Sequence, residues 1–497
     1  MELVCPAGNI DKLEYAYTYG ADTAYIGLKR FSLRIKADNF YDDEYKRVIE
    51  LKKKYPEKKL YCALNISFHN HDIDQFMKNL DYFHQYPIDS FIIQDLGMVR
   101  LLQKEFPNVH LHLSTQASCV NKEAVRMYHD LGFTRVVLGR EATLSEIREI
   151  KDAVPEMELE CFAHGAMCIA YSGRCLMSAY LTGRSAQSGF CSHTCRWDYD
   201  VLVDGNKLNH TNSLNSDEAA AIAKSGALLL EEHQRRGEYF PVFEGENFTA
   251  VLSSKDLCMI RHLDDMKKAG VDAIKVEGRM KSVYYVAMVT RAYRKALDAL
   301  DGKISAEEAE PFIRSLDEVA HRESTTGFYY NRGEADKTTV GASDSPFILA
   351  AAVKECLSDS DANAVLAAGS ELVAAREAEI AAMHPGARAA VLKDLEQHPE
   401  KVIKTVQKKE GWKIYPLDPL NKIDVGTELE FISPDELCKT VLGSEYEFIN
   451  PKTGEKLDWV NADHDCALYT PLQILPGTLV RMKDEGYIPG QIRSGGR

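Results

Sequence analysis

The sequence predicts an α/β fold in which a (β/α)8 TIM-like barrel, carrying an inserted cysteine-cluster segment, precedes a small antiparallel β-barrel domain. In the first part of the chain, eight short apolar runs alternate with amphipathic patterns, which is typical of right-handed βαβ units and a parallel sheet. Beyond about residue 335 the pattern changes to short strands separated by turns. A doubly wound open sheet would look similar, and the eight strands favour the closed barrel.

Each strand is expected from a short run of apolar residues that ends in polar or turn residues. The eight runs are Glu2–Cys5, Asp22–Leu28, Lys59–Asn65, Ser90–Asp95, His110–Ser114, Arg135–Arg140, Glu158–Ala163 and Val271–Glu277. Apolar residues three or four apart predict helices at Ile10–Tyr19, Tyr41–Lys54, Asp72–Tyr86, Met98–Phe106, Leu144–Ala153 and Tyr285–Leu297. More than 100 residues separate the seventh strand from the eighth, which indicates an insertion.

Two domains are expected. Residues 1–335 form the barrel domain, with a cluster-bearing insertion at 168–245, and residues 336–497 form the β domain. The strands of the β domain are expected at Phe347–Val353, Glu428–Ile432, Ala467–Leu472 and Leu479–Met482. The segment at about 355–410 is rich in Ala and Glu and is broken by a Pro-Gly pair, so it predicts an inserted helical hairpin. We expect this hairpin to be a surface elaboration without chemistry.

Composition limits the functional classes. The 60 Lys and Arg against 75 Asp and Glu give a net charge of −15, which argues against non-specific coating of nucleic acid but allows a local basic groove. No run reaches the ~18 apolar residues that a membrane-spanning helix needs, and the first residues show no signal-peptide pattern. We therefore expect a cytoplasmic protein with no membrane partner. In that compartment, clustered cysteines are more typical of metal or catalytic sites than of disulfides.

Four of the 12 cysteines lie within 28 residues: Cys168, Cys175, Cys191 and Cys195, separated by six, fifteen and three residues. Zinc is often held by paired CxxC knuckles, which this segment lacks. The wider and unequal spacings suit a [4Fe–4S] cluster at least as well. Glycines nearby allow the backbone to turn around a bulky group. The pattern predicts a metal centre on these four thiols, with iron–sulfur favoured over zinc.

Polar residues follow many of the predicted strands. In a parallel barrel these strand ends meet at one rim, where active sites are built. The alternative interpretation, that strands simply end in polar turns, becomes less attractive when several such ends converge. The catalytic candidates at or near this rim are Gln116, Glu160, His164 and Glu277.

Several motifs resemble those of the peptidase U32 family. They are Cys5-Pro6-Ala7-Gly8, Tyr17-Gly20-Ala21-Asp22-Tyr25, His112-Leu113-Ser114-Gln116-Ala117, Glu160 to Cys168, Gly173 to Ser178, Lys275 to Ser282, and His321-Arg322 with Thr326-Gly327-Phe328. The resemblance covers residues 1 to about 335 well and the β domain more loosely. Within the family the chain looks most like the branch that makes 5-hydroxyuridine at the wobble position of tRNA, especially at Cys191 to Trp197.

This resemblance implies a [4Fe–4S] cluster on the four clustered cysteines and prephenate as a small co-substrate. It also implies hydroxylation of uridine 34 in the tRNA anticodon region, with an electron donor that the sequence does not identify. Cations suited to prephenate carboxylates or to RNA are Arg30, Arg34, Arg140, Arg174, Arg279 and Lys281. Aromatic candidates for holding an unstacked base are Phe31, Phe40, Phe68 and Tyr171.

Two other hypotheses stay open at this point. A peptidase, as the family name records, needs an activated nucleophile or a metal-bound water. The chain has no HExxH or GxSxG motif, and His164 as base with Glu160 as acid would lack a third group. A non-catalytic scaffold would instead bind zinc on the four thiols, and the many polar strand ends argue against it.

Overall fold

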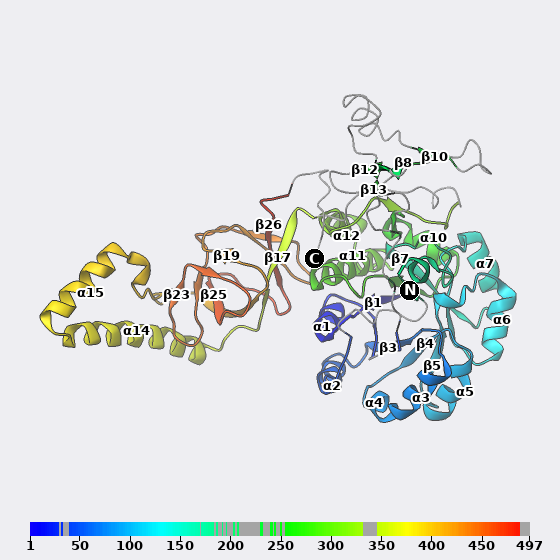
Figure 1. Ribbon diagram of the computed structural model, residues 1–497, viewed down its shortest axis with the longest axis horizontal. Coiled ribbons are helices and arrows are strands. Elements are labelled where there is room, and N and C mark those ends of the chain that lie inside the picture. Colours follow the sequence, from blue (N-terminus) through cyan, green and yellow to red (C-terminus); the bar gives the residue numbers. More distant parts are fainter. Residues whose placement is uncertain are drawn as a thin grey trace. The chain divides into compact units, whose positions relative to one another are not determined.

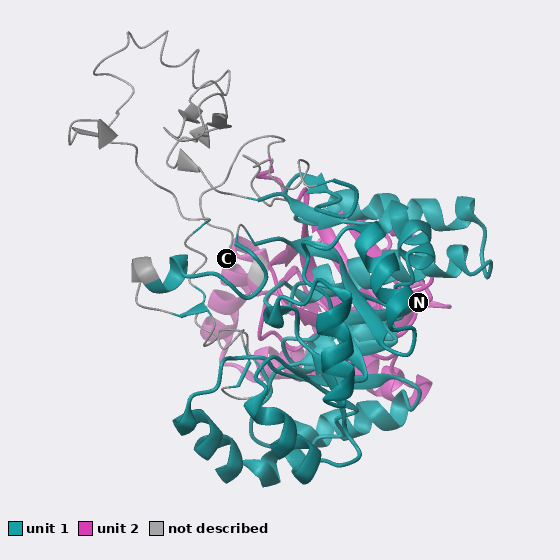
Figure 2. Cartoon of the chain, turned by 90° about the vertical axis from the view of Figure 1, so that its right-hand side faces the viewer, with its two compact units in different colours: residues 1–344, 488–497 teal, residues 345–487 magenta. Residues whose placement is uncertain are grey.

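The computed structural model describes two compact units, residues 1–344 with 488–497, and residues 345–487 (Figure 2). The described residues are 1–28, 31–32, 39–168, 170–182, 185–186, 191, 195, 254–331 and 345–487, with the backbone of six short strands between 202 and 250. Those strands are β8 (Leu202–Val203), β9 (Asn206–Lys207), β10 (Leu229–Glu231), β11 (Tyr239–Pro241), β12 (Phe243–Glu244) and β13 (Thr249–Ala250). Most of the predicted insertion at 168–245 therefore lies outside the described residues.

Eight parallel strands close into a barrel in the first unit (Figure 1). They are β1 (Glu2–Pro6), β2 (Thr23–Ile26), β3 (Lys59–Leu64), β4 (Ser90–Ile93), β5 (His110–Leu113), β6 (Arg135–Val137), β7 (Glu158–Ala166) and β15 (Ala273–Val276). Strand β15 pairs in parallel with both β1 and β7, which closes the sheet. The predicted (β/α)8 class is confirmed, and each predicted strand overlaps an observed one. Two further strands, β14 (Asp256–Cys258) and β16 (Ser324–Thr325), extend the sheet from the end of β7.

Helices surround the barrel strands (Figure 1). They are α1 (Ile10–Thr18), α2 (Tyr45–Lys54), α3 (Asn70–Lys78), α4 (Leu80–His84), α5 (Gly97–Glu105), α6 (Lys122–Asp130), α7 (Leu144–Ala153), α8 (Met177–Thr182), α10 (Leu263–Lys268), α11 (Val283–Leu300) and α12 (Ala306–Arg314), with 3-10 turns η1 (Thr115–Ala117), η4 (Ile260–His262) and η5 (Ser315–Glu318). Helix α6 was not predicted because only Val125 of its residues is buried, so its apolar pattern is weak.

The single helix predicted over Asp72–Tyr86 is two helices, α3 and α4, separated at Asn79. The Asn79 side-chain amide donates to the Gln75 carbonyl at 2.6 Å, and its backbone N–H donates to Phe76 instead. Because the side chain occupies the carbonyl that an α-helix would offer to the Asn79 backbone, the helix is interrupted there.

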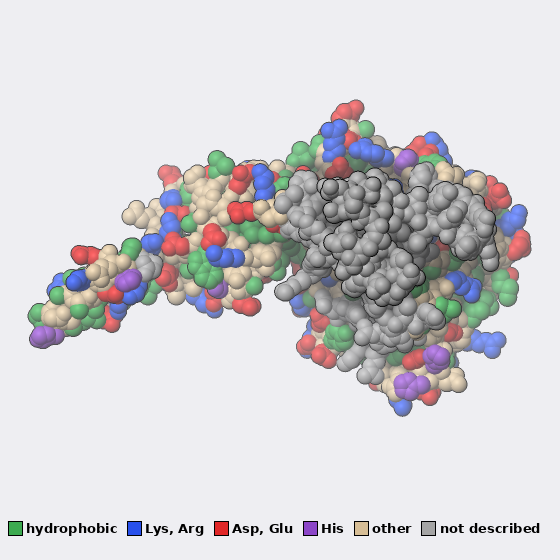
Figure 3. All heavy atoms as spheres, turned by 45° about the horizontal axis from the view of Figure 1, so that its top comes forward, with side chains coloured by type: hydrophobic (Ala, Val, Ile, Leu, Met, Phe, Trp, Pro, Cys, Tyr) green, Lys and Arg blue, Asp and Glu red, His purple; other side chains and the backbone are tan. Residues whose placement is uncertain are grey.

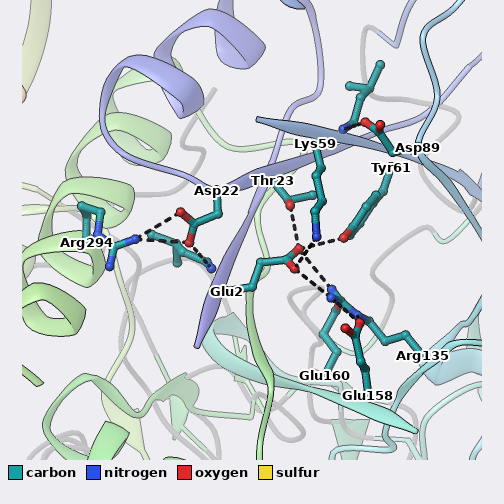
Figure 4. A network of polar contacts seen from close by, with 12 residues as sticks. Glu2, Asp22, Thr23, Lys59, Tyr61, Asp89, Arg135, Glu158, Glu160 and Arg294 are labelled. Atoms are coloured by element: carbon teal, nitrogen blue, oxygen red, sulfur yellow. Dashed lines mark hydrogen bonds and ion pairs between the residues drawn. The ribbon is translucent and has the colours of Figure 1, made fainter. Parts of the chain in front are cut away.

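The interior of the barrel contains a buried charge network (Figure 4). Arg135 on β6 is 2% exposed, and its guanidinium lies 2.8 Å from Glu2, 2.7 Å from Glu158 and 3.0 Å from Glu160. Burial by itself would raise the pKa of Glu2, but the hydrogen bonds and charge of Arg135 lower it well below its ordinary range. Lys275 on β15 joins the network through Glu160 at 2.7 Å. The charges therefore compensate one another inside the barrel.

The second unit contains an eight-stranded antiparallel sheet in the order β21-β20-β26-β17-β18-β25-β22-β23. Its strands are β17 (Phe347–Val353), β18 (Lys413–Pro419), β20 (Leu429–Ile432), β21 (Lys439–Val441), β22 (Glu447–Ile449), β23 (Lys456–Leu457), β25 (Cys466–Thr470) and β26 (Leu479–Lys483), beside a small pair of β19 (Ile423–Asp424) and β24 (Trp459–Val460). The predicted antiparallel β class is confirmed.

Between β17 and β18 the chain forms two helices, α14 (Asp359–Ala382) and α15 (Pro385–Gln397), followed by the 3-10 turn η6 (Pro399–Lys401) (Figure 1). Val365 of α14 packs into a small apolar cluster with Ile414 and Tyr469 of the sheet, whereas α15 buries none of its residues. Among the described residues, no helix combines the length and apolar character needed to cross a membrane.

Candidate functional site

A cavity of about 240 Å³ lies at the carboxyl-terminal ends of the barrel strands. Its lining includes Asn65 after β3, Gln116 after β5, Arg140 after β6 and Glu277 after β15. Residues from separate strands thus meet at one rim because the closed parallel barrel brings their carboxyl ends together. This is the rim at which the sequence predicted an active site.

All four clustered cysteines line this same cavity. Cys168 is exposed, the other three are half-buried, and none of the four forms a disulfide. In the described parts of the chain, no three Cys, His, Asp or Glu side chains are gathered closely enough to hold one metal ion. In a [4Fe–4S] cluster each thiolate binds a different iron atom, so its ligands stand farther apart than those of a single zinc ion. The four thiols around this cavity match the ligands of a [4Fe–4S] cluster in chemical type and in number.

The loop that carries the first two cysteines is fastened to the ends of β5 and β6. The Ser172 backbone N–H donates to Glu141 Oε1 at 2.8 Å, and the Arg140 backbone N–H donates to Ser172 Oγ at 3.3 Å. Gly173 has a φ of +75°, and a Cβ there would lie 2.0 Å from the carbonyl oxygen of Gln116. Only glycine fits this close approach, so Gly173 lets the cysteine loop pack onto the rim.

The charged residues of the lining are mostly cations. Among the described lining residues there are four cations, Arg140, Lys275, Arg279 and Lys281, and one carboxylate, Glu277. The whole chain carries a charge of −15, and on the described part of the face in Figure 3 acidic and basic side chains are interspersed. The cavity therefore differs in sign from the chain as a whole. A cationic pocket favours ligands that carry carboxylates or phosphates.

Arg279 is held rigidly at the wall of this cavity. It is 3% exposed, and its guanidinium donates to Ser32 Oγ at 2.6 Å and to Asn39 Oδ1 at 2.7 Å. A Cβ at Gly27 would lie 2.6 Å from this guanidinium, and one at Gly8 would lie 2.1 Å from the Arg279 carbonyl oxygen. The glycines near the ends of β1 and β2 therefore make room for Arg279.

Glu277 is positioned through its backbone. Its N–H donates to the His164 carbonyl at 2.8 Å, and its own carbonyl accepts from the Tyr285 hydroxyl at 3.0 Å. A Cβ at Gly165, whose φ is +106°, would lie 2.6 Å from the same Glu277 carbonyl. Strand β7 and helix α11 thus fix the place from which the Glu277 side chain reaches the cavity.

Three predicted site residues do not line the cavity. Glu160 is fully buried between Arg135 and Lys275. His164 is 8% exposed, its Nδ1 lies 3.4 Å from the Tyr293 hydroxyl, and burial lowers its pKa to about 4. Arg174 donates from Nε to Ser118 Oγ at 3.2 Å. These positions indicate structural contacts behind or beside the cavity.

Two further candidates, Arg30 and Arg34, lie outside the described residues. Of the aromatic candidates, Phe40 is buried, and Phe31 is buried in a cluster that includes Phe68, their ring centroids 5.7 Å apart. Tyr171, by contrast, is 60% exposed and lines the cavity. Tyr171 is therefore the aromatic candidate with a free face at the site.

Sequence reasoning missed one charged residue among the described lining of the cavity, Lys275. It lies within strand β15, and its Nζ is 4.4 Å from the centroid of the Tyr25 ring. A lysine in the middle of an otherwise apolar strand indicates a buried charged partner, because lysine is rarely buried without one. That partner, Glu160, is 115 positions away in the sequence, so the pair was not visible before the fold was known.

Comparison with known proteins places the chain in a family. The sequence model described as Peptidase family U32 matches residues 8–339. The chain belongs to peptidase family U32. The matched range contains every described residue that lines the cavity of this U32 chain.

Three relatives of this U32 chain have informative names. The tRNA hydroxylation protein P of Escherichia coli (strain K12) is 38% identical over 341 residues, which cover 66% of this chain and 74% of that protein. The tRNA hydroxylation protein P1 of Bacillus subtilis (strain 168) is 38% identical over 330 residues, or 66% and 70% of the two chains. The 23S rRNA 5-hydroxycytidine C2501 synthase of Escherichia coli (strain K12) is 32% identical over 362 residues, or 71% of this chain and 48% of that one.

Proposed function

We propose that this protein is an iron–sulfur-dependent tRNA-modifying enzyme that hydroxylates uridine 34 to 5-hydroxyuridine and depends on prephenate. The observation that carries the proposal is the meeting of four cysteine thiols and four cations around one cavity at the barrel rim. The names of the relatives support the same class of reaction, since two are tRNA hydroxylation proteins and one makes a hydroxylated base in ribosomal RNA.

The thiolates of Cys168, Cys175, Cys191 and Cys195 would hold the [4Fe–4S] cluster, which supplies one-electron chemistry when bound. The rigid attachment of the loop around Gly173 to the rim would keep two of these ligands beside the reacting groups. If dioxygen supplies the hydroxyl oxygen, two electrons from a separate donor would reduce its second oxygen atom to water.

Prephenate carries two carboxylates, and the cations of the cavity suit it. Arg140, Arg279 and Lys281 all line the cavity, and a guanidinium can bind a carboxylate through two parallel hydrogen bonds. Arg279 is already oriented by Ser32 and Asn39, so little side-chain freedom is lost when a ligand binds.

The target base would enter the same cavity from an unstacked anticodon. The exposed ring of Tyr171 provides a face for stacking. Glu277, the single carboxylate among the described lining residues, is the candidate to take up the proton that leaves C5 of uracil. The geometry offers less to a peptidase, because His164 is packed against Tyr293 rather than facing the cavity.

The test is mass spectrometry of tRNA nucleosides from a deletion strain with and without the restored gene. Loss and recovery of 5-hydroxyuridine derivatives is the expected result, and unchanged tRNA nucleosides would contradict the proposal. Metal analysis of anaerobically purified protein tests the cofactor separately. About four irons and four sulfides per chain are expected, whereas one zinc would favour the scaffold hypothesis.

A further inference from the structure

Lys275 is one of the four cations at the cavity, and the proposed function gives it no individual role. Its side chain is 6% exposed, and its Nζ lies 2.7 Å from Glu160 Oε1 and 4.4 Å from the centroid of the Tyr25 ring. A buried ammonium is stable only where its charge is compensated. The Glu160 carboxylate and the face of the Tyr25 ring supply that compensation.

Glu160 is itself fixed from behind. It is fully buried, and its second oxygen accepts from Arg135 Nη1 at 3.0 Å. Arg135 is in turn held by Glu2, 2.8 Å away (Figure 4). With Lys275, the chain of contacts runs from the base of the barrel to the cavity. Because its two oxygens contact different cations, the Glu160 carboxylate cannot rotate away from Lys275 without also losing its contact with Arg135. The position of the Lys275 ammonium is therefore set by the network.

A second cation, Arg140, shares the Phe162 ring with Lys275 as a neighbour. The guanidinium carbon of Arg140 is 3.8 Å from the centroid of the Phe162 ring, and Lys275 Nζ is 6.0 Å from it. Phe162 belongs to β7, which lies between the strands that carry the two cations. Within the described parts of the chain, Arg140 forms no ion pair, so its charge at the cavity is not neutralised by a neighbour.

We propose that Lys275 and Arg140 together form the carboxylate-binding floor of the cavity, and that Glu160 is a positioning residue that holds the Lys275 ammonium there. This inference rests on the proposed function and deepens it by naming the cations that bind the small carboxylate. An ammonium has three N–H donors. Lys275 donates one of them to Glu160, and it can donate to a bound carboxylate while it stays on Glu160.

The experiment measures prephenate binding to the full-length, anaerobically purified protein by calorimetry. K275M is expected to weaken binding about tenfold or more, since it removes a hydrogen bond between two charged groups. K275R keeps the cation and is expected to restore most of the affinity. E160Q leaves the ammonium less firmly placed and is expected to weaken binding by a smaller factor, with iron and sulfide contents unchanged. Lys268→Met, at an exposed lysine of α10, is the control.

Wild-type affinity in a folded K275M protein would overturn the inference, and so would the absence of prephenate binding by the unmodified protein. If K275M does not fold, E160Q decides, because wild-type affinity there removes the positioning role. A protein that binds prephenate in a Lys275-dependent manner but restores no 5-hydroxyuridine in cells leaves this inference standing and contradicts the proposed function instead.

Discussion

Charged side chains are paired differently at the two ends of the barrel interior. At the amino-terminal end, Arg135 is surrounded by Glu2, Glu158 and Glu160 at 2.7 to 3.0 Å. At the carboxyl-terminal end, four cations line the cavity with one carboxylate, and Arg140 forms no ion pair among the described residues. A network in which every carboxylate has a cationic partner closes one end of the barrel. Incomplete compensation leaves the other end ready for an anionic ligand.

One β-barrel therefore supplies both a rigid network of paired charges and a cavity for an anionic ligand. Glu160 and Lys275 join the two ends through a contact of 2.7 Å. Changes at the closed end should therefore act mainly on stability, whereas changes at the open end should act mainly on binding and chemistry. Variants at each end test this division.

The strongest test at the open end is Cys175→Ala. It removes one of four proposed cluster ligands, so the protein should lose its iron and sulfide and all 5-hydroxyuridine formation. Metal analysis and nucleoside mass spectrometry measure the two losses. Cys356→Ala, at an exposed cysteine of the second unit, should change neither. Full tRNA modification in the Cys175 variant would end the hydroxylase proposal.

The matching test at the closed end is Arg135→Met. Removing the guanidinium leaves the buried Glu2 and Glu160 without their main partner, which should lower the free energy of unfolding by about 3–5 kcal/mol. Urea denaturation measures this change. Arg126→Met breaks an exposed pair with Glu123 and should have little effect. Equal stability of the two variants would contradict the division between the ends.

The pH dependence of stability tests a residue behind the cavity. His164 is buried and is not among the residues that line the cavity. Burial lowers its pKa from 6.5 to about 4, so the unfolded chain binds more protons between these values. The free energy of unfolding should therefore fall as the pH drops through this window, by roughly 2–3 kcal/mol. His164→Gln should flatten the profile, and His71→Gln, at an exposed histidine, should not. Thermal unfolding between pH 4 and 7 measures the slope.

The smallest expected effect is that of Arg140→Ala. Because Arg140 is half-buried and forms no ion pair among the described residues, its loss should barely change the melting temperature. Prephenate binding should weaken about tenfold, with the cluster intact. Arg140→Lys should recover part of the affinity. A large loss of stability with unchanged affinity would place Arg140 with the structural residues instead.

Much of the fold could be predicted from local pattern. The strands β3 and β5 and the helix α7 fall close to their predicted bounds, since apolar periodicity records which face of each element is buried. The boundary at Asn79 could not be predicted, because it depends on a side-chain hydrogen bond that competes with the helix. Spacing also singled out the four cysteines, which the closed barrel then places around one cavity.

The alternation of strands and helices, the cysteine quartet and the polar strand ends could all be predicted without a structure, because these are local properties of the chain. Which charged residues line the cavity and which pair with one another depended on the tertiary structure. Glu160 and Arg140 both stood at predicted strands, yet one is buried against Arg135 and the other lines the cavity. Closure of the barrel made that distinction, since it pairs charges from strands that are far apart in the sequence.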